Sequence, residues 1–508
     1  MLSVVYGAGL SGLDGFLITI ECSGQRNLPA LNIVGLPDLA VREAKERIRA
    51  AADNSGLPIP EMELILNLAP ADKRKEGSSL DLSMLVSILQ CGGIIPREIG
   101  MRDKCFLGEL SLSGEVRKIR GVLNMTLCAK EAGIKEIYVP VENAAEAAAV
   151  EGITVYGTPS VRALVDHLKG EDPLAAAVPI VPDFADFAGG VDFSEVRGQA
   201  QAKRAMEIAA AGAHNLLLVG PPGSGKSMLA KRFPTIMPPL SFAESVEITK
   251  IHSVAGTLES GSGLITQRPF RAPHHTMSAP SLVGGGKIPT PGELALAHGG
   301  VLFLDELPEY PRIVTESLRQ PLEDGAVTIT RAAGRCTFPC RVTMIAAMNP
   351  CPCGNHGSGQ QPCTCSTEMR HRYLAKISGP LLDRIDMHIR VSAVSFSEMS
   401  DTTPGESSAA IRERVIRARE FAARRFAGVT PVPNGALSPA QTREMCTPDA
   451  AGLSVMKMAM EKLGLSARGY DRLLRVARTI ADLAGSETVT ASHVAEAIQM
   501  RSLDRDMK

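Results

Sequence analysis

The chain has 508 residues, enough for about two to four domains of ordinary size, so a single small binding module is excluded. Its 54 Lys and Arg residues face 55 Asp and Glu residues, and the formal net charge of -1 excludes nucleic-acid binding by bulk charge. Any DNA contact must therefore come from local clustering of basic side chains. Aromatic residues make up only 4% of the chain and Trp is absent, which argues against a platform of stacked aromatic side chains for bases.

The amino-terminal stretch has no basic region before its apolar residues, and no apolar run approaches the roughly 18 residues that could span a bilayer. The 11 cysteines are an odd number, and four of them fall into one short window, which disfavours a secreted disulfide framework. We therefore expect a reduced, cytoplasmic protein without membrane contact.

Two breaks in composition divide the chain into three blocks. Residues 171–190 hold prolines among alanines and acidic residues, a composition that supports neither a helix nor a central strand and predicts an interdomain linker. A polar stretch that begins at residue 397 precedes a strongly helical tail. The predicted domains are therefore residues 1–170, 191–396 and 397–508.

The first block alternates strand-like and helical segments. Residues 31–35 and 63–69 are apolar runs typical of strands. A helix is predicted to begin at Asp38, or at the preceding Pro37, and to end just before Gly56.

A glycine-rich loop in the second block stands between a predicted strand at residues 216–219 and a predicted helix. Its sequence fits G-x-x-x-x-G-K-[ST], a pattern in which backbone N–H groups face phosphates, the lysine reaches the β and γ phosphates, and the last hydroxyl holds Mg²⁺. Strand, loop and helix together predict a parallel α/β sheet that binds ATP. The candidate binding residues are Gly220, Pro221, Pro222, Gly223, Ser224, Gly225, Lys226 and Ser227.

Two further predicted strands end in polar residues that suit the same site. The apolar run 301–304 is followed by Asp305 and Glu306. We expect Asp305 to complete the Mg²⁺ shell through water and Glu306 to orient and polarise the attacking water. The strand at 341–348 ends at Asn349, where open α/β sheets place their ligands, so its amide is expected to sense the γ phosphate or position water, unless it only caps the loop.

Residues 326–340 alternate with a period of two around residues 332–334, which predicts a β-hairpin. Arg331 and Arg335 flank its tip, where they are candidates for phosphate contacts unless the hairpin is simply solvated.

Cys351, Cys353, Cys363 and Cys365 form two C-x-C pairs within one short loop. Four thiolates can close a tetrahedral Zn²⁺ site, with His356 as a possible replacement for one ligand. The common spacing in zinc ribbons is C-x2-C, so reduced or disulfide-forming thiols remain the alternative.

Hydrolysis in such ATPases needs a cation at the developing charge, often from a neighbouring subunit. Arg384 is a candidate for that cation, or it forms a plain ion pair with Asp383 or Asp386. In the helical tail, Arg468 and, one turn later, Arg472 are candidates for reaching back to the phosphates, or they lie on a solvated helix face.

With these motifs in this order, the chain resembles an AAA+ ATPase. Segments 251–256, 268–286, 291–310 and 379–389 closely resemble the magnesium-chelatase-like ComM/YifB family, essentially end to end, with PFRAPHH and GELALAHGGVLFLDE as the most specific stretches. The resemblance implies an α/β fold class: an AAA+ P-loop NTPase core with an insertion at residues 256–292, an N-terminal Lon-protease-like α+β domain and a C-terminal helical lid.

The resemblance also implies a function. Family members are expected to be homo-hexameric rings that use ATP and Mg²⁺ to translocate on single-stranded and branched DNA without sequence preference. The resemblance further implies that they act as helicases in branch migration during recombination of transforming DNA, with recombination proteins as partners. In such a ring the hairpin with Arg331 and Arg335 would face the pore. The insertion offers a second basic set, Arg268, Arg271, His274, His275 and Lys287.

The first block departs from Lon at one position. The segment KEGSSLDLSM resembles the Lon stretch with the nucleophilic serine and places Ser79 there, whereas Leu123 falls where the Lon lysine would stand. A serine without an adjacent base is a weak nucleophile, so we expect a structural or DNA-engaging domain, unless Lys118 or Lys130 serves as the base.

Two rival functions belong to other classes. One is a magnesium-chelatase-type ATPase subunit that inserts Mg²⁺ into a porphyrin with partner subunits, against which the Lon-like block and the cysteine window speak. The other is a Lon-like ATP-dependent protein remodeller. Stimulation of ATP hydrolysis by DNA separates both from the helicase.

Overall fold

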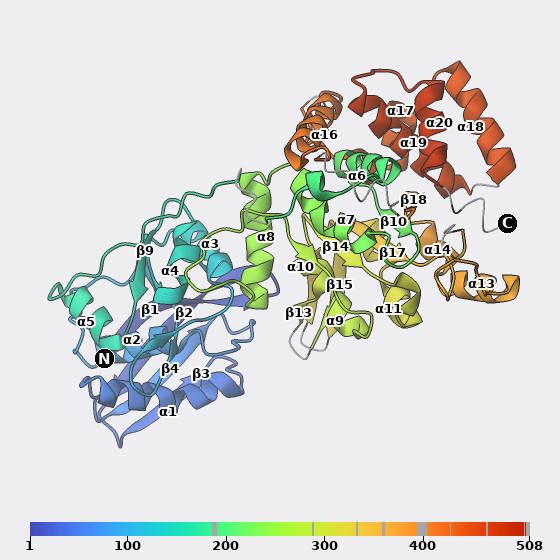
Figure 1. The fold of residues 1–508 in the computed structure, drawn as a ribbon. Coiled ribbons are helices and arrows are strands. Elements are labelled where there is room, and N and C mark those ends of the chain that lie inside the picture. Colours follow the sequence, from blue (N-terminus) through green and yellow to red (C-terminus); the bar gives the residue numbers. More distant parts are fainter. Residues whose placement is uncertain are drawn as a thin grey trace.

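The computed structural model describes residues 1–184, 190–286, 289–331, 334–357, 361–393, 404–426, 428–463, 466–501 and 503. Figure 1 shows three regions in chain order: an N-terminal α/β domain in blue and teal, a central domain in green and yellow, and a helical region in red. Within the described residues, no helix combines the length and the apolar character that a membrane crossing requires.

The N-terminal domain is built on a seven-stranded sheet. Its strands lie in the order β3 (Ala30–Val34), β4 (Glu63–Ala69), β2 (Asp14–Gln25), β1 (Leu2–Ser11), β5 (Lys104–Phe106), β8 (Glu136–Pro140) and β9 (Thr154–Thr158). Its helices are α1 (Leu39–Asn54), α2 (Asp81–Cys91), α3 (Val122–Glu131), α4 (Ala144–Ala148) and α5 (Val161–Lys169), and the short strands β6 (Glu109–Leu110) and β7 (Val116–Arg117) pair with each other.

Local signals in the sequence fix the ends of α1. The Asp38 carboxylate accepts a hydrogen bond of 2.8 Å from the backbone N–H of Val41, which satisfies one of the free donors of the first turn. Gly56 follows the helix with a φ of 66°, a left-handed conformation that glycine adopts at low cost. The predicted start at Asp38 and end before Gly56 are confirmed.

The central domain contains a five-stranded sheet in the order β11 (Phe270–Arg271), β14 (Val301–Leu304), β17 (Thr343–Met348), β10 (Leu216–Val219) and β18 (Met387–Arg390). All four strand pairings are parallel, so the carboxyl ends of the strands lie together at one end of the sheet. Every residue of β10, β14 and β17 is buried, as expected for central parallel strands covered on both faces. The predicted α/β fold is confirmed.

Nine helices and two hairpins surround this sheet among the described residues. The helices are α6 (Ala200–Gly212), α7 (Lys226–Arg232), α8 (Phe242–Ala255), α9 (Ala279–Val283), α10 (Glu293–Leu296), α11 (Arg312–Ser317), α12 (Pro321–Asp324), α13 (Thr367–Leu374) and α14 (Gly379–Leu382). The hairpins pair β12 (Gly284–Gly285) with β13 (Thr290–Pro291) and β15 (Ala326–Arg331) with β16 (Gly334–Pro339). The hairpin predicted at 326–340 is confirmed, although its turn residues 332 and 333 lie outside the described residues.

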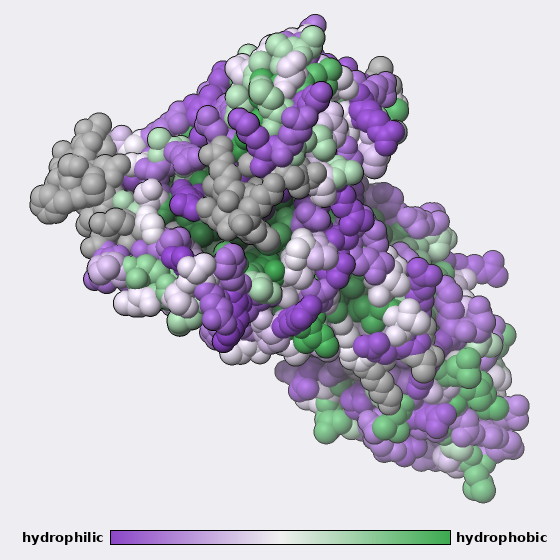
Figure 2. All heavy atoms as spheres, turned by 90° about the vertical axis from the view of Figure 1, so that its right-hand side faces the viewer, coloured by the Kyte–Doolittle hydropathy of each residue, from purple (hydrophilic) through white to green (hydrophobic). Residues whose placement is uncertain are grey.

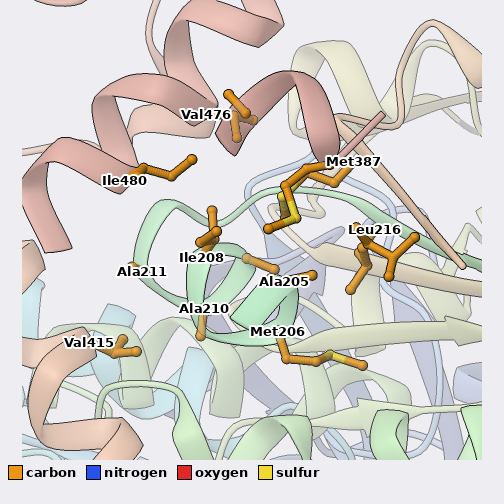
Figure 3. Packing of buried hydrophobic residues seen from close by; sticks show 14 of the residues in the cluster. Ala205, Met206, Ile208, Ala210, Ala211, Leu216, Met387, Val415, Val476 and Ile480 are labelled. Carbon is orange, nitrogen blue, oxygen red and sulfur yellow. The ribbon is translucent and has the colours of Figure 1, made fainter. Parts of the chain in front are cut away.

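The helical region comprises α16 (Ser408–Ala423), α17 (Pro439–Met445), α18 (Ala450–Leu463), α19 (Ala467–Leu483) and α20 (Ala491–Gln499). The C-terminal domain was predicted to begin at residue 397. Residues 397–403 and 504–508 lie outside the described ranges. Figure 3 shows Val476 and Ile480 of α19 close to Ile208 of α6, within one buried apolar cluster. The lid therefore shares its core with α6 of the central domain.

The N-terminal domain contacts the central domain through α3 and α8. The N–H of Gly121 donates to the carbonyl of Ser253 at 3.1 Å, and the Ser253 hydroxyl donates to Glu146, whose carboxylate also accepts from the N–H of Leu123. Figure 1 shows α8 standing between the two domains. At a second contact, a Cβ on Gly12 would lie 2.9 Å from Cys336 Sγ, so the β1–β2 turn abuts the β15–β16 hairpin.

Candidate nucleotide site and its neighbouring clusters

The glycine-rich loop follows β10 and leads directly into α7. Gly223 and Gly225 adopt φ angles of 73° and 84°, the left-handed region that favours glycine. A Cβ on Gly220 would lie 2.3 Å from the carbonyl oxygen of Val391, so only glycine fits where the loop leaves the sheet. The loop is thereby curled over the carboxyl edge of the sheet, as a phosphate-binding loop requires.

Lys226 lies under the loop with its ammonium group held by oxygens. Its Nζ donates to the carbonyl oxygens of Gly220 and Pro221, each at 2.8 Å, and lies 3.4 Å from Asn349 Oδ1. Burial lowers the pKa of Lys226 from its ordinary value, while the carboxylates of Asp305 and Glu306 act in the opposite direction. When ATP is bound, phosphate oxygens would replace these carbonyl oxygens as hydrogen-bond acceptors of the ammonium group.

Ser227 and the residues after β14 supply oxygen ligands of the kind Mg²⁺ prefers. The Ser227 hydroxyl donates to Asp305 Oδ2 at 2.7 Å, and Asp305 Oδ1 accepts from the N–H of Glu306 at 3.0 Å. A hydroxyl and a carboxylate 2.7 Å apart suit a magnesium ion bound jointly by protein and phosphates. The structure thus brings together the predicted residues Lys226, Ser227, Asp305 and Asn349.

Glu306 is oriented differently from Asp305. Its backbone adopts a φ of 51°, uncommon for a residue with a side chain, and its side chain is 57% exposed. One carboxylate oxygen, Oε2, lies 3.3 Å from Nδ1 of His275. From the sequence, His275 belongs to the basic set of the insertion, and nothing in the spacing of the two residues relates it to Glu306.

Arg384 and Arg468 lie together, away from the glycine-rich loop. Arg384 forms an ion pair with Glu323, and Arg468 NH2 lies 3.8 Å from the other oxygen of that carboxylate. The predicted alternative, in which Arg384 pairs with Asp383 or Asp386, is wrong: Asp386 instead contacts His214 and Arg472 at 3.5 and 3.7 Å.

The two arginines lie at the end of the sheet where its parallel strands begin. Arg384 precedes β18, and its carbonyl accepts a 3.1 Å hydrogen bond from the side chain of Asn215, which precedes β10. Since β10 and β18 are parallel, the glycine-rich loop lies at the opposite edge. Because α19 packs on α6, Arg468 lies beside Glu323, at the end of the sheet opposite the glycine-rich loop of its own chain.

Four cysteines converge beside the glycine-rich loop. The sulfur atoms of Cys351, Cys353, Cys363 and Cys365 all lie within 4.8 Å of one another. The Cys351–Cys353 distance is 3.4 Å, and Cys363 lies 3.7 Å from each of them. Zn–S bonds of about 2.3 Å in a tetrahedron give sulfur separations of about 3.8 Å, so this donor set fits zinc.

Two thiols of the cluster lie in different electrostatic environments. Backbone N–H groups of Asn355 and Thr364 point at Cys353 and lower the pKa of its thiol to about 5, whereas burial raises that of Cys351 to about 11. His356 pairs with Arg370 at 3.0 Å and is not among the grouped donors. A Cβ on Gly354 would lie 2.5 Å from Pro222, so the loop packs directly against the nucleotide loop.

The basic residues of the insertion do not form one surface. Arg271 makes two hydrogen bonds to Glu293, at 2.6 and 2.7 Å. Arg268 pairs with Glu244 and donates to the carbonyl of Gly299 at 2.6 Å. These two arginines are each held by an acidic residue from a neighbouring segment. His274 is exposed and contacts Thr276, and Lys287 lies outside the described residues.

The β15–β16 hairpin keeps one face packed and one face open. Val327, Ile329 and Phe338 are buried against the central domain, while Arg331 and Arg335 are exposed at the end of the two strands. Arg331 NH2 comes within 3.9 Å of the position a Cβ would take on Gly285 in β12. The two hairpins therefore lie side by side.

The Lon-like positions of the N-terminal domain do not assemble a catalytic pair. Leu123 is fully buried in α3, and Ser79 is partly buried before α2. Lys118 is engaged elsewhere, since its Nζ donates to the carbonyl of Leu258 at 2.7 Å and lies 3.3 Å from Ser260. Lys130 is exposed and its side chain lies beside Gly152. Neither lysine contacts Ser79.

Family models of magnesium chelatase match most of the chain. The model described as "Magnesium chelatase, subunit ChlI" covers residues 192–399, "Subunit ChlI of Mg-chelatase" covers 20–143, and the "subunit ChlI C-terminal" model covers 405–501.

Curated relatives match end to end. Competence protein ComM of Haemophilus influenzae is 40% identical over 508 residues, covering 99% of this chain and 98% of its own length. YifB of Escherichia coli is 39% identical over 505 residues with the same coverage. A Lon protease of Flavobacterium johnsoniae is 29% identical over 147 residues, 28% of this chain and 18% of that protease. The chain therefore belongs to the magnesium-chelatase-like ComM/YifB family of AAA+ proteins, a membership that implies an ATPase using ATP and Mg²⁺.

Proposed function

We propose that this protein is an ATP-dependent DNA helicase or translocase that drives branch migration during homologous recombination of transforming DNA. The nucleotide site supports a motor, and the relative from Haemophilus influenzae bears the name of a competence protein. The proposed substrate is single-stranded and branched DNA, bound without reading its sequence.

The observation that carries this proposal is the pair of exposed arginines at the end of the β15–β16 hairpin. Arg331 and Arg335 project from adjacent strands, and no residue of the pair is buried. Guanidinium groups contact backbone phosphates without base specificity. Because the net charge of the chain is only -1, sequence-independent DNA contact requires a local cluster of basic side chains such as this pair.

We further propose that the working form is a ring of identical subunits, a homo-hexamer. Arg384 stands at the edge of the sheet opposite the glycine-rich loop of its own chain, so a second copy must deliver it to a nucleotide. A cation that reaches the γ phosphate from a neighbouring subunit is a recurring arrangement in nucleotide hydrolysis. Arg468, beside the same Glu323, would arrive with it.

The cysteine cluster is proposed to hold Zn²⁺. The sulfur separations of 3.4 to 3.7 Å suit a tetrahedral ion, and the loop has little apolar core of its own. The ion would fix the loop that packs on Pro222 and so keep the nucleotide loop in shape.

The test is a branch-migration assay on four-way and forked DNA, with ATP and with a non-hydrolysable analogue. The double variant Arg331→Ala, Arg335→Ala should lose DNA stimulation of hydrolysis and flatten the dependence of log Kd on log salt by about 0.7 to 0.9 per lost phosphate contact. Arg417→Ala is the matched control, because that exposed arginine pairs with Glu413 within α16. Unchanged DNA stimulation in the double variant would contradict the proposal.

A second candidate, a magnesium-chelatase-type ATPase subunit, is favoured by the descriptions of the three family models. In that function, partner proteins and not DNA would stimulate ATP hydrolysis. Measuring hydrolysis of the purified protein with DNA alone separates the two candidates. A Lon-like protein remodeller is less supported, since Leu123 and Lys118 leave Ser79 without a base.

A further inference from the structure

A cavity of about 230 Å³ lies at the carboxyl ends of β10 and β18. Its walls come from the start of the glycine-rich loop, the cysteine loop, α13, the end of β18 and Leu503. Lys226, Ser227 and Asp305, which suit the phosphates and Mg²⁺ of ATP, do not line it. Open parallel α/β sheets bind their ligands at this end of the strands, so the cavity is a candidate for a second ligand site.

Basic side chains gather in this cavity. α13 presents one helical face to it, because its lining residues recur at i, i+3, i+4 and i+7: Thr367, Arg370, His371 and Leu374. His356 and Arg390 add two more basic side chains, and none of the described lining residues is Asp or Glu. Figure 2 views the molecule from the side on which α13 lies in Figure 1, and hydrophilic residues, in purple, cover much of this face. A cleft lined by charges of one sign attracts a ligand of the opposite sign, here an anion.

Neutral partners orient the guanidinium group of Arg370. Its NH1 lies 3.0 Å from Nδ1 of His356, and its NH2 donates to the Thr367 hydroxyl at 3.0 Å. These two bonds use two of the five N–H donors of the guanidinium group and leave its positive charge without an acidic partner. By contrast, Arg372 on the same helix pairs with Glu368 at 3.0 Å and does not line the cavity. Arg370 therefore offers a cation that is already held in position for a ligand.

The cysteine loop keeps the opposite wall free of a bulky side chain. Gly357 adopts a φ of 74°, and a Cβ on it would lie 3.7 Å from Arg390 NH1. A longer side chain at this position would fill the space beside that guanidinium group. Arg390 is level with Val219, the last residue of β10, so the sheet itself supplies the second guanidinium group. Two guanidinium groups and an imidazole in one cavity suit a doubly charged phosphate better than a singly charged carboxylate.

We propose that this cavity is a binding site for a small ligand that carries a phosphate or diphosphate group, separate from the nucleotide site. Arg370 and Arg390 bind the oxyanion, and His371 adds a further N–H donor. The apolar walls, which include Pro221 and Leu374, pack against the remainder of the ligand. Because several segments enclose the cavity, a free small molecule fits it better than the backbone of a DNA strand. The site is independent of the DNA contact proposed for the β15–β16 hairpin.

The experiment measures pyrophosphate binding by isothermal titration calorimetry. The full-length protein is first saturated with Mg²⁺ and a non-hydrolysable ATP analogue, so that the glycine-rich loop is occupied. Wild type is compared at one ionic strength with Arg370→Gln, Arg370→Lys and Arg372→Gln. Arg372→Gln is the matched control, because it removes the same charge from the same helix outside the cavity. The affinity of each variant for the ATP analogue shows whether its central domain is folded.

Wild type should bind pyrophosphate at a single site beyond the nucleotide site. Arg370→Gln should raise the Kd by about 10- to 100-fold, since a hydrogen-bonded charge pair is lost. Arg370→Lys, which keeps the charge but not the forked donors, should raise it less, and Arg372→Gln should leave it unchanged. Absence of binding to the wild type, or an equal loss in Arg370→Gln and Arg372→Gln, overturns the proposal. Binding that occurs only when the ATP analogue is omitted also overturns it, because the cavity would then belong to the nucleotide site.

Two further ligands test the charge and the source of the phosphate. Acetate should bind at least about 10-fold more weakly than pyrophosphate, because it has one charge and a single carboxylate. A single-stranded oligonucleotide should not displace bound pyrophosphate. Displacement by the oligonucleotide that is lost in Arg370→Gln would show that the cavity holds the DNA backbone, and would overturn the small-ligand site. None of these outcomes depends on whether the protein is a helicase.

Discussion

The central and N-terminal domains place their polar residues in opposite ways. In the central domain, Lys226, Asp305 and Asn349 follow three neighbouring parallel strands and meet within hydrogen-bonding distance of one another or of Ser227. In the N-terminal domain, the position of a Lon-type lysine holds Leu123, fully buried in α3. The central domain therefore retains the polar residues that nucleotide chemistry needs. In the N-terminal domain, a buried apolar side chain stands at the position that is reactive in Lon. Fold likeness alone therefore does not carry catalytic function from Lon to this chain.

The largest expected effect removes the chemistry of the central domain. Glu306→Gln keeps the shape of the side chain but cannot act as a base, so hydrolysis should fall by about 10²- to 10⁴-fold. Nucleotide binding should persist in this variant and be lost in Lys226→Ala, since Lys226 is the cation under the loop. Fluorescent-nucleotide titration and phosphate release measure the two properties. Full hydrolysis by either variant would contradict the assignment of the site.

The next effect tests whether packing has truly replaced chemistry in the N-terminal domain. Leu123→Lys restores the residue type of Lon but places an ammonium group at a fully buried position. An unpaired buried charge or a polar group without a hydrogen bond costs several kcal/mol, so the thermal midpoint of this domain should fall by roughly 5 °C or more, without gain of peptide cleavage. Leu123→Met, similar in volume, is the control. Peptidase activity in Leu123→Lys would show that a single residue separates the domain from a protease.

A smaller effect concerns the loop between the nucleotide site and its neighbours. Metal analysis of the purified protein should find about one Zn²⁺ per chain, bound by four thiolates. Chelation should lower the thermal midpoint of the central domain and weaken nucleotide binding, because the cysteine loop packs on Pro222. Cys353→Ser should behave as the chelated protein, and Cys128→Ser, on α3, should behave as the wild type. A zinc content near zero in freshly purified protein would reject the metal.

The parts that the sequence predicts well are those in which spacing and chemistry coincide. The glycine-rich loop, Asp305 and Asn349 each sit at the end of an apolar run, and the carboxyl ends of parallel strands necessarily share an edge. The hairpin at 326–340 was likewise readable from its period of two. The four cysteines were grouped because they lie within one short loop.

The parts that the sequence missed depend on contacts between distant segments. Arg384 pairs with Glu323, and His275 with Glu306, because sheet order and loop packing bring them together. The positive charge of Arg271 is paired with the carboxylate of Glu293 in the folded chain. The position of Arg468 depends on the packing of α19 against α6. The apolar periodicity of α19 predicts a buried face but not the helix against which that face packs.

The smallest expected effect completes the comparison of the two domains. Ser79→Ala removes the one hydroxyl that Lon would use, at a partly buried position next to α2. If the domain is a scaffold, the free energy of unfolding should change by no more than about 0.5 kcal/mol, because the substitution creates no cavity of note and removes no named partner of the side chain. ATP hydrolysis, with and without DNA, should match the wild type. A matched substitution, Ser78→Ala, should have the larger effect, since the Ser78 hydroxyl donates to Glu109 and its loss leaves that carboxylate short of a donor. If Ser79→Ala instead abolished an activity of the full chain, the N-terminal domain would have to be counted with the central domain as a reactive site.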